Sequence, residues 1–432
     1  PGARLHPLLI GIGEFGSRHT GGADAGSPRY IAVKSNQSLN TMLFPHADDC
    51  LLPFVFEDGE RAEPLYYVPI LPLAIMEGHQ NPSEGWSHLS FARQMTEVIG
   101  ILRQMLDPES VLGTRLRAIA DAFQTKPFDM PEDLGAVEAD LQLQANIGKF
   151  HGEVRDGWHY GVIEFVSTRK AIRVTDLPIT VATDTYLKTF NEKLVRGKPN
   201  PLHQIIIPPI DNHGSADGVD ITIPLRPDVW EKYKDSPDEL MVILHLRKSL
   251  KSALNYVRCD GSVVEFGSSY LGTMMYWFGF RKQLYHARLD REIILLELRI
   301  MLEESILRYI QAASQLQISK LADDDAMIAV LQEHTFPSIH ATLLSEPGFY
   351  PTDQLRALIL GGTVHFDYIL NLRERDLVQK SYAARLEKVV KYRRELELRR
   401  SYLGNKPFAG ATLWLSEIDI LVNKQTVRRP TR

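Results

Sequence analysis

The spacing of hydrophobic residues changes along the chain and predicts three structural regions before a short C-terminal segment. Over residues 1–120, short apolar runs alternate with residues that form turns. Apolar residues at helical spacing predict a helix over residues 91–106. The prolines of residues 66–72 push their predecessors out of the helical conformation and predict an extended segment there. This mixture predicts a compact α+β domain over residues 1–120.

Residues 125–272 carry mainly the pattern of strands. Alternating or β-branched runs lie between Gly, Asp and Pro residues at 160–166, 171–174 and 219–223, and such runs are typical of strands. One helix is predicted between them, over residues 184–194. The region is therefore predicted to be a second α+β domain.

Residues 273–403 combine helical periodicity with a high density of charge. One apolar stripe runs from Met274 for more than thirty residues, and a second runs over residues 373–403. The segment between them is broken by Pro337, Pro347 and Pro351. Two long charged helices around a small knot predict an antiparallel coiled-coil arm with a globular tip at about residues 325–372. Two core helices of an ordinary bundle are the alternative, although the charge density favours the arm.

Length, charge and cysteine content limit the class of protein. A chain of 432 residues is longer than one hydrophobic core usually serves, so two to four domains are expected. Lys and Arg number 49 against 54 Asp and Glu, a net charge of −5, so a nucleic-acid site would have to be a local patch. Cys50 and Cys259 cannot build a disulfide scaffold or a four-thiolate zinc site, which indicates a reducing compartment.

Neither a membrane span nor a leader sequence is predicted. No run approaches the roughly 18 uninterrupted apolar residues that a spanning helix needs. The chain begins at Pro1 without an initiator Met or a signal peptide, so we expect it to be part of a longer polypeptide.

A glycine loop near the N-terminus matches a dinucleotide-binding pattern. Gly11, Gly13 and Gly16 form GxGxxG after an apolar run. That fingerprint requires a helix to open at the third glycine, where its N-terminus holds the pyrophosphate. The residues that follow, 17–22, disfavour a helix. A nucleotide site is therefore not predicted, and a nucleotide-dependent oxidoreductase remains only as a rival hypothesis.

Histidine and aspartate pairs give no metal motif. The fourteen histidines include no HExxH and no Cys/His pair at zinc spacing. His151 and His159 flank an apparent turn and are predicted to lie on the surface. Asp48 and Asp49 are predicted to form a solvated turn, because a hard cation needs further converging oxygens.

Arg29 and Tyr30 form the pair with the most informative chemistry. Phenol is a poor nucleophile at neutral pH because its pKa is near 10. A neighbouring guanidinium can hold a phosphodiester with two hydrogen bonds and neutralise the charge that grows in phosphoryl transfer. Tyrosine can also carry a strand end as an aryl phosphodiester, which keeps the energy needed to rejoin it. By composition alone, however, such a pair more often has a structural role, in which the side chains pack against the protein or face solvent.

Several segments, in this order, resemble the breakage–reunion region of the type IIA DNA topoisomerases, especially the eukaryotic and large-DNA-virus branch. The resemblance spans nearly the whole chain and is specific as a set. Its segments are residues 13–18, 21–24, 27–31, 43–45, 48–49, 63–64, 67–72, 85–87, 172–178, 278–281, 366–370 and 413–419.

The resemblance implies a reaction at Tyr30. Tyr30 would attack a DNA phosphate and become linked to a 5′-phosphate, while Arg29 would stabilise the transition state. Pro82, Arg18 and Lys34 would contact the DNA. Mg²⁺ would be held by a Toprim domain and ATP by an ATPase region of the same polypeptide or of a partner subunit, so no cofactor is expected on this segment.

The resemblance also implies an architecture of the α+β class. Residues 1–120 would be a winged-helix domain without its N-terminal part, residues 125–272 an α/β tower domain, and residues 273–403 a long antiparallel coiled-coil arm with a globular C-gate tip. Residues 404–432 would be a C-terminal helix and tail. The partners would be double-stranded DNA and a second copy of the chain, in the host cytoplasm or nucleus.

One departure from the family concerns the residue that wedges between DNA bases. The family places an isoleucine where this chain has Pro82, four residues before Trp86. Proline is among the apolar residues that proteins use to unstack bases, although most loop prolines only stiffen a turn.

Two further expectations complete the sequence-based hypotheses. The tip is predicted to dimerise because it holds more apolar residues than a small knot needs, namely Ile328, Val330, Leu331, Leu343, Leu344, Leu358, Ile359 and Leu360. A non-catalytic, DNA-binding coiled-coil structural protein, in which Tyr30 is only a packed residue, is the alternative to the enzyme.

Overall fold

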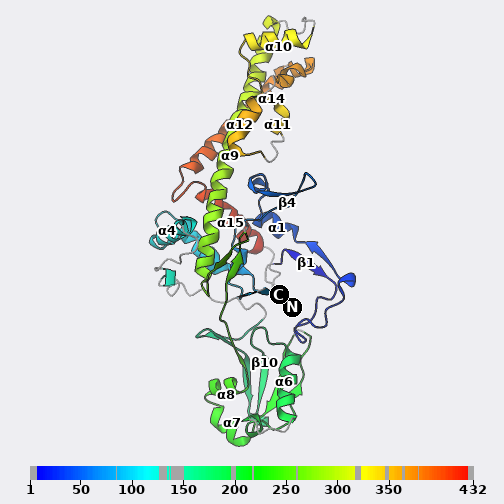
Figure 1. Ribbon diagram of the computed structural model, residues 1–432, viewed down its shortest axis with the longest axis vertical. Coiled ribbons are helices and arrows are strands. Elements are labelled where there is room, and N and C mark those ends of the chain that lie inside the picture. The colour runs from blue at the N-terminus through cyan, green and yellow to red at the C-terminus, as the bar shows by residue number, and fades with distance from the viewer. Residues whose placement is uncertain are drawn as a thin grey trace. The chain divides into compact units, whose positions relative to one another are not determined.

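In the computed structural model the chain folds into two compact units. Figure 1 shows their helices and strands, coloured by residue number. The described residues are 7–83, 85–125, 134–135, 137, 150–195, 201–216, 218–258, 261–316, 323–345, 350–361, 365–377 and 379–426. Unit 1 comprises residues 1–41, 71–102 and 118–276, and unit 2 comprises residues 42–70, 103–117 and 277–432. Cys259 and Pro347, named above, lie outside the described residues.

The first part of unit 1 consists of short strands and turns around a glycine loop. Strands β1 (Leu9–Ile12) and β2 (Ala32–Ser35) pair antiparallel, with the 3₁₀ turn η1 (Pro28–Tyr30) just before β2. Residues 18–24 form turns after Gly16. The antiparallel pairing and the missing helix show that the dinucleotide-binding hypothesis is wrong. Helix α1 (Gln37–Leu43) follows β2.

A second group of elements in unit 1 surrounds a hairpin. Helix α2 (Leu73–Met76) precedes the antiparallel strands β5 (His79–Ser83) and β6 (Trp86–Ser90). Helix α3 (Met95–Leu106) confirms the helix predicted over residues 91–106 but begins four residues later. Before it, the Phe91 amide donates to the Tyr270 hydroxyl and the Arg93 amide to the Ile75 carbonyl. Helix α4 spans Val111–Thr125, and its residues up to Arg117 belong to unit 2, as do the last four residues of α3.

Two sheets dominate the remainder of unit 1. One has the order β11-β12-β10-β9 and the other the order β13-β8-β7, both antiparallel. The strands are β7 (Val154–Arg155), β8 (Trp158–Tyr160), β9 (Val162–Val166), β10 (Ala171–Asp176), β11 (Asp211–Asn212), β12 (Ile221–Pro224) and β13 (Arg247–Ser249). All three predicted strand segments are confirmed.

Helices cover the larger sheet and close its core. The helices α6 (Thr183–Val195), α7 (Pro227–Tyr233) and α8 (Pro237–Ile243) share one apolar core with β10 and β12 (Figure 1). Alternate residues of β10 and β12 point into this core, where Ile172, Ile221 and Ile223 are fully buried. Burial of such a continuous apolar cluster is the main stabilising contribution to this part. The short hairpin β14 (Asn255–Val257) and β15 (Val263–Glu265) completes unit 1.

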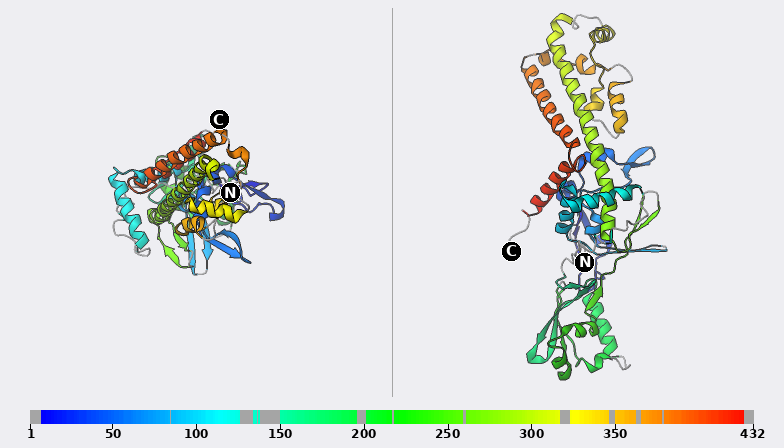
Figure 2. Two further views of the ribbon diagram at one scale, coloured as in Figure 1. Left: turned by 90° about the horizontal axis from the view of Figure 1, so that it is seen from above. Right: turned by 90° about the vertical axis from the view of Figure 1, so that its left-hand side faces the viewer.

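Two long antiparallel helices form the frame of unit 2. Helix α9 (Tyr270–Leu316) and helix α14 (Gln379–Leu403) lie side by side (Figure 2). Their shared apolar core is Ile293, Leu296, Ile300, Leu307, Val389 and Leu396. Ion pairs flank that core, with Glu303 bonded to Arg385 at 2.7 Å and Glu297 to Arg400 at 2.8 Å. Because the later residue on α14 pairs with the earlier one on α9, the helices run in opposite directions.

Between the long helices, a group of short helices packs on α9. These are α10 (Asp324–Glu333), α11 (Ala341–Ser345), α12 (Thr352–Leu360), α13 (Asp367–Leu370) and the 3₁₀ turn η6 (Glu374–Leu377). Seven of the eight apolar residues predicted to be in excess here lie in this group's own core or pack against it. Three of these seven are buried, four are only partly buried, and Leu358 is 37% exposed, so the predicted apolar excess stays a prediction.

The N-terminal part of α9 packs against α15 (Ala411–Thr426) and against a 3₁₀ turn η2 (His46–Leu51). The indole ring of Trp414 stacks on Phe278 and Tyr285 at centroid distances of 5.0 and 5.2 Å, and its Nε1–H donates to the Ile70 carbonyl at 3.0 Å. The hairpin β3 (Phe54–Glu57) and β4 (Glu60–Pro64) follows η2.

Two sequence-based expectations about surface residues are corrected here. Asp48 does not lie in a solvated turn but is buried, where it accepts a hydrogen bond from Arg281. His159 is also fully buried, although His151 is exposed as predicted. Burial lowers the pKa of His159, because desolvation disfavours the charged ring. In the part of the chain that the structure describes, no helix is long and apolar enough to cross a membrane.

Candidate active site

Tyr30 lies on the short turn η1, with its side chain in solvent. Pro28 occupies the first position of the turn, where its fixed φ suits a helical start, and the Tyr30 amide donates to the Ser27 carbonyl at 2.8 Å. The Tyr30 side chain is 74% exposed. The Arg29 guanidinium lies 5.1 Å from the centre of the Tyr30 ring. An exposed phenol beside a guanidinium can receive a phosphate from solvent and hold its charge.

The loop before Tyr30 folds back on itself, and two of its glycines are required for this. Gly16 and Gly22 have φ values of +89° and +95°, a region that other residues rarely adopt. A Cβ on Gly16 would lie 2.7 Å from the Cα of Gly22. Gly16, the third glycine of the GxGxxG pattern, therefore serves a close backbone approach to Gly22 rather than a nucleotide.

Asp24 organises the same loop from within. Its Oδ1 accepts the Ser17 amide at 2.7 Å and the Thr20 hydroxyl at 2.5 Å. These hydrogen bonds, that of Thr20 first, hold the pKa of Asp24 well below its usual range. Asp24 is therefore ionised at neutral pH and committed to the loop.

Arg18 extends from this loop to strand β10. Its guanidinium forms an ion pair with Asp176 and lies 4.3 Å from the centre of the Phe150 ring. The Arg18 side chain is 12% exposed, and that of Asp176 only 2%. Arg18 was predicted to contact DNA. That role stays a prediction, and the structure shows that its charge is already engaged within the chain.

Lys34 is an exposed residue of β2, paired across the ribbon with Ile10 of β1. All residues of both strands are exposed. Lys34 follows Tyr30 by four residues, and its side chain is accessible for the predicted contact with DNA.

Pro82 lies near the end of the β5–β6 hairpin, opposite Ser87, and is exposed. It belongs to unit 1, as Tyr30 does, but to a separate element. The position of Pro82 at an exposed hairpin end is compatible with the wedge predicted from the sequence.

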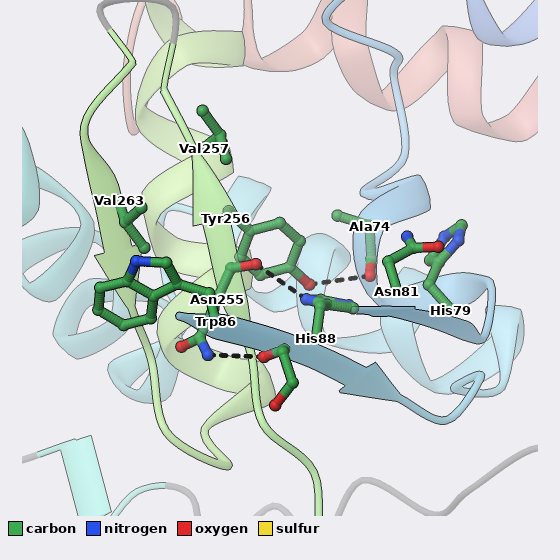
Figure 3. Close-up of a pocket in the computed structure, with 10 residues that line it drawn as sticks. Ala74, His79, Asn81, Trp86, His88, Asn255, Tyr256, Val257 and Val263 are labelled. Carbon is green, nitrogen blue, oxygen red and sulfur yellow. Dashed lines mark hydrogen bonds between the residues drawn. The ribbon is translucent and has the colours of Figure 1, made fainter. Parts of the chain in front are cut away.

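The hairpin with Pro82 is held to β14 by polar contacts (Figure 3). Its ladder continues through the bridge between Leu89 and Ala253. His88 shares a 3.0 Å hydrogen bond with the Asn255 carbonyl, and the Asn255 amide donates to the Ser87 carbonyl at 2.8 Å. A cavity of about 390 Å³ lies beside these contacts, lined by Ala74, His79, Asn81, Trp86, Ser87, His88, Asn255, Tyr256, Val257 and Val263.

The predicted residues other than Lys34 of β2 therefore fall into three places. Arg29 and Tyr30 are adjacent and face solvent, Arg18 belongs to the same loop but is engaged by Asp176, and Pro82 lies on a separate hairpin. Sequence reasoning did not identify Asp176 as part of the site. The only feature of the sequence that pointed to Asp176 was its place in residues 172–178, one of the segments that resemble the topoisomerase family.

No group of three or more His, Cys, Asp or Glu side chains suited to a metal ion occurs among the described residues. Asp24 is the carboxylate closest to Tyr30 in the loop sequence, and its Oδ1 is occupied by Ser17 and Thr20. The described carboxylates therefore do not fit a resident metal ion at Tyr30.

Comparisons with known proteins identify relatives along almost the whole chain. The chain is 36% identical to the DNA topoisomerase 2 of African swine fever virus (strain Badajoz 1971 Vero-adapted) over 427 residues, which are 97% of this chain and 34% of that protein. It is 30% identical to human DNA topoisomerase 2-beta over 191 residues, 44% of this chain and 10% of that protein. The chain thus spans about a third of the length of its viral relatives.

The fold has a solved counterpart. The structure aligns with the DNA-binding, cleavage and re-ligation domain of Plasmodium falciparum topoisomerase II at a TM-score of 0.65, with 20% identity, over 97% of this chain and 52% of that one. The mixed helix and strand architecture is therefore that of this domain. Residues 3–418 match the family model that describes the A subunits of DNA gyrase and topoisomerase IV. A match over so much of the chain shows that it belongs to this DNA gyrase/topoisomerase IV family.

Proposed function

We propose that this chain is the DNA breakage–reunion part of an ATP-dependent type II DNA topoisomerase, which passes one duplex through a transient break in another. The observation that carries the proposal is the exposed Tyr30 beside the Arg29 guanidinium, on a loop with internal order. The viral and animal relatives named DNA topoisomerase 2 support it.

The proposed reaction is a reversible exchange of phosphodiesters. The Tyr30 Oη attacks a backbone phosphorus, the bond from phosphorus to the 3′-oxygen breaks, and the 5′-phosphate remains on the tyrosine. The phenol proton is lost and the departing 3′-oxygen gains one, so that protons and charge balance. Attack by the 3′-hydroxyl on the phosphotyrosine restores the strand without an external energy source.

Arg29 supplies the electrostatic part of this reaction. Negative charge grows on the phosphate oxygens in the transition state, and a guanidinium can offer two parallel hydrogen bonds to them. Mg²⁺ is proposed to be held by a Toprim domain, because Asp24 is committed to its own loop. ATP is proposed to act in an ATPase region. Both regions would lie in the same polypeptide or in a partner subunit.

The proposed domains are those of the resemblance. Residues 1–120 would be the winged-helix domain, residues 125–272 the tower, residues 273–403 the coiled-coil arm with its tip at about 325–372, and residues 404–432 the C-terminal helix and tail. The antiparallel packing of α9 and α14, with ion pairs at its edges, supports the arm.

Double-stranded DNA and a second copy of the chain are the proposed partners. The exposed position of Pro82 supports its role as a wedge in DNA. Dimerisation through residues 325–372 rests on the family, since most apolar residues of this segment are used internally. Sedimentation should show a dimer that deletion of residues 325–372 disrupts, and a monomer at micromolar concentration would contradict this part of the proposal.

The central test is the trapping of a covalent protein–DNA adduct with detergent in the full-length protein, with Mg²⁺ present. The wild type should form the adduct, and Tyr30→Phe should form none while it still binds DNA, because only the nucleophilic oxygen is lost. Tyr350→Phe is the matched control, since Tyr350 is also exposed. An adduct with the Tyr30→Phe variant would refute the assignment, and DNA binding without any wild-type adduct would favour the structural DNA-binding protein.

A further inference from the structure

We propose that Asp176 is a positioning residue for the attack by Tyr30, because it anchors the loop that carries Tyr30 through Arg18. Asp176 lies on β10, far from Tyr30 in sequence, and would not touch the DNA. The inference rests on the proposed function and names an element of unit 1 that controls the same site.

The anchor is a buried carboxylate with several donors around it. Asp176 Oδ2 accepts the His151 amide at 2.5 Å, and Oδ1 accepts the Leu177 amide at 2.8 Å and the guanidinium of Arg18. A buried carboxylate with this many partners has one orientation, since any other would leave donors unpaired. Arg18 also stacks on Phe150 and so has little freedom of its own.

Neighbouring residues of the loop are attached to the same part of unit 1. The His19 amide donates to the Ala216 carbonyl at 3.0 Å, and the His19 carbonyl accepts the Asp184 amide at 2.9 Å. A Cβ on Gly21 would lie 3.1 Å from the Cβ of Ala182. The loop is therefore held at Arg18 and just after it, by a side-chain pair and by backbone hydrogen bonds.

Internal hydrogen bonds carry this anchorage forward to Tyr30. Asp24 ties the Ser17 amide and the Thr20 hydroxyl to one point, and the Gly26 amide donates to the Glu14 carbonyl at 2.9 Å. Tyr30 follows Gly26 by only four residues. A segment braced in this way moves as one piece, so a shift at Arg18 is passed to η1.

The consequence for the reaction follows from geometry. A displacement of about 1 Å between reacting atoms can cost about 10²-fold in rate, even when the altered residue is remote from the chemistry. Tyr30 is exposed and has no surrounding core to hold it. Its position therefore depends on the loop, and Asp176 is one of the anchors of that loop, beside the backbone hydrogen bonds of His19.

The first experiment measures the loop itself, without DNA. Hydrogen–deuterium exchange should become faster in peptides covering residues 13–30 of the Asp176→Asn variant, because the amide side chain cannot serve the same three donors. Asp238→Asn is the matched control. Asp238 accepts two hydrogen bonds from Arg155, at 2.7 and 3.0 Å, in an exposed pair of the same unit. Its loss should leave exchange over residues 13–30 unchanged.

The second experiment measures single-turnover DNA cleavage and DNA affinity in the full-length protein. Asp176→Asn should reduce the cleavage rate by about tenfold or more, within the range expected for a misplaced nucleophile, and change the Kd for DNA by less than about threefold. Arg18→Lys, which keeps the charge, should retain more cleavage than Arg18→Leu. If Asp176→Asn does not fold, the comparison of Arg18→Lys with Arg18→Leu still tests the same anchor.

The outcomes separate this proposal from the proposed function. Faster loop exchange with unchanged cleavage would overturn the positioning role and leave the enzyme intact. Parallel losses of cleavage and affinity would overturn it as well, in favour of a direct DNA contact by Arg18. If the wild type forms no adduct, the proposed function fails and the positioning role fails with it, whatever the exchange data show.

Discussion

Each unit contains a tyrosine beside an arginine, and the two tyrosines have opposite surroundings. Tyr30 of unit 1 is mostly exposed, with Arg29 at 5.1 Å from its ring. Tyr285 of unit 2 is fully buried, with Arg281 at 4.2 Å from its ring. The hydroxyl of Tyr285 donates to Glu417 at 2.5 Å. A guanidinium near a phenol therefore does not by itself identify a nucleophile.

Burial is what distinguishes the two roles. Desolvation raises the pKa of Tyr285, because the phenolate would lose its hydration. Its oxygen is also occupied by Glu417 and shielded by Trp414, so no substrate can reach it. Tyr30 has neither restriction. The comparison shows that the same residue pair serves as structure in a core and is open to chemistry on a loop.

The arginines differ in the same way. Arg281 is fully buried and donates to Asp48 at 2.6 Å and to the Val68 carbonyl at 2.9 Å. Arg288 joins the group, with a 2.8 Å hydrogen bond to Glu417. Arg288 also pairs with Glu292 at 3.0 Å, so each arginine of this group has carboxylate partners, as buried charges require. Arg29 is exposed, so that its charge remains available to a phosphate.

The largest expected effect is in the buried cluster. Asp48→Ala should lower the free energy of unfolding by about 3–5 kcal/mol, because Arg281 would keep its charge in the interior without its hydrogen-bonded carboxylate, leaving only Glu417 at 3.8 Å. Urea denaturation monitored by circular dichroism would measure it. Asp49→Ala is the control, since the Asp49 side chain is 44% exposed and the change should cost less than about 0.5 kcal/mol. Equal effects of the two changes would contradict the assigned difference in burial.

Arg29→Lys should affect rate and leave stability unchanged. Lysine keeps the charge but loses the forked geometry, and removal of one such electrostatic partner costs about 10²–10³-fold in rate. Single-turnover cleavage by the full-length protein would measure the effect. Arg247→Lys is a suitable control, because Arg247 also lies over an aromatic ring, that of Trp158, away from the loop. An unchanged cleavage rate in the Arg29 variant would rule out its proposed role.

Removing each hydroxyl tests the two tyrosines directly. Tyr285→Phe should cost about 1–3 kcal/mol of stability, because it leaves a Glu417 oxygen without its donor in a buried site. Tyr30→Phe should change the thermal unfolding temperature little. If the stability losses were reversed between the two variants, the distinction between a structural and an exposed tyrosine would fail.

Pro82 is expected to affect DNA bending and cleavage with little effect on stability. Pro82→Gly should reduce DNA bending and cleavage, since unstacking a base step needs a rigid apolar group. Thermal stability should stay almost unchanged, because Pro82 is exposed. Energy transfer between dyes on the two DNA ends would report the bend, and Pro82→Ile should retain it. Wild-type bending by the Gly variant would mean that Pro82 only stiffens its turn.

Local patterns in the sequence predicted most elements correctly. The strand runs at 160–166, 171–174 and 219–223 and the helix at 184–194 depend on side-chain periodicity, which is a property of neighbours in sequence. The two long helices were predicted for the same reason. Arg29 and Tyr30 were singled out by their chemistry, which requires only adjacent residues, and by the resemblance, which depends on the order of segments along the chain.

Tertiary structure decided which polar residues are buried and what they bind. Asp48 and His159 were expected in solvent, because Asp-Asp and a histidine near a turn are usually exposed, yet each is enclosed by elements distant in sequence. Arg18 and Asp176 are 158 residues apart, and no local pattern relates them. Burial and long-range pairing depend on how elements pack, so only the folded chain revealed that the loop with Tyr30 is anchored to β10.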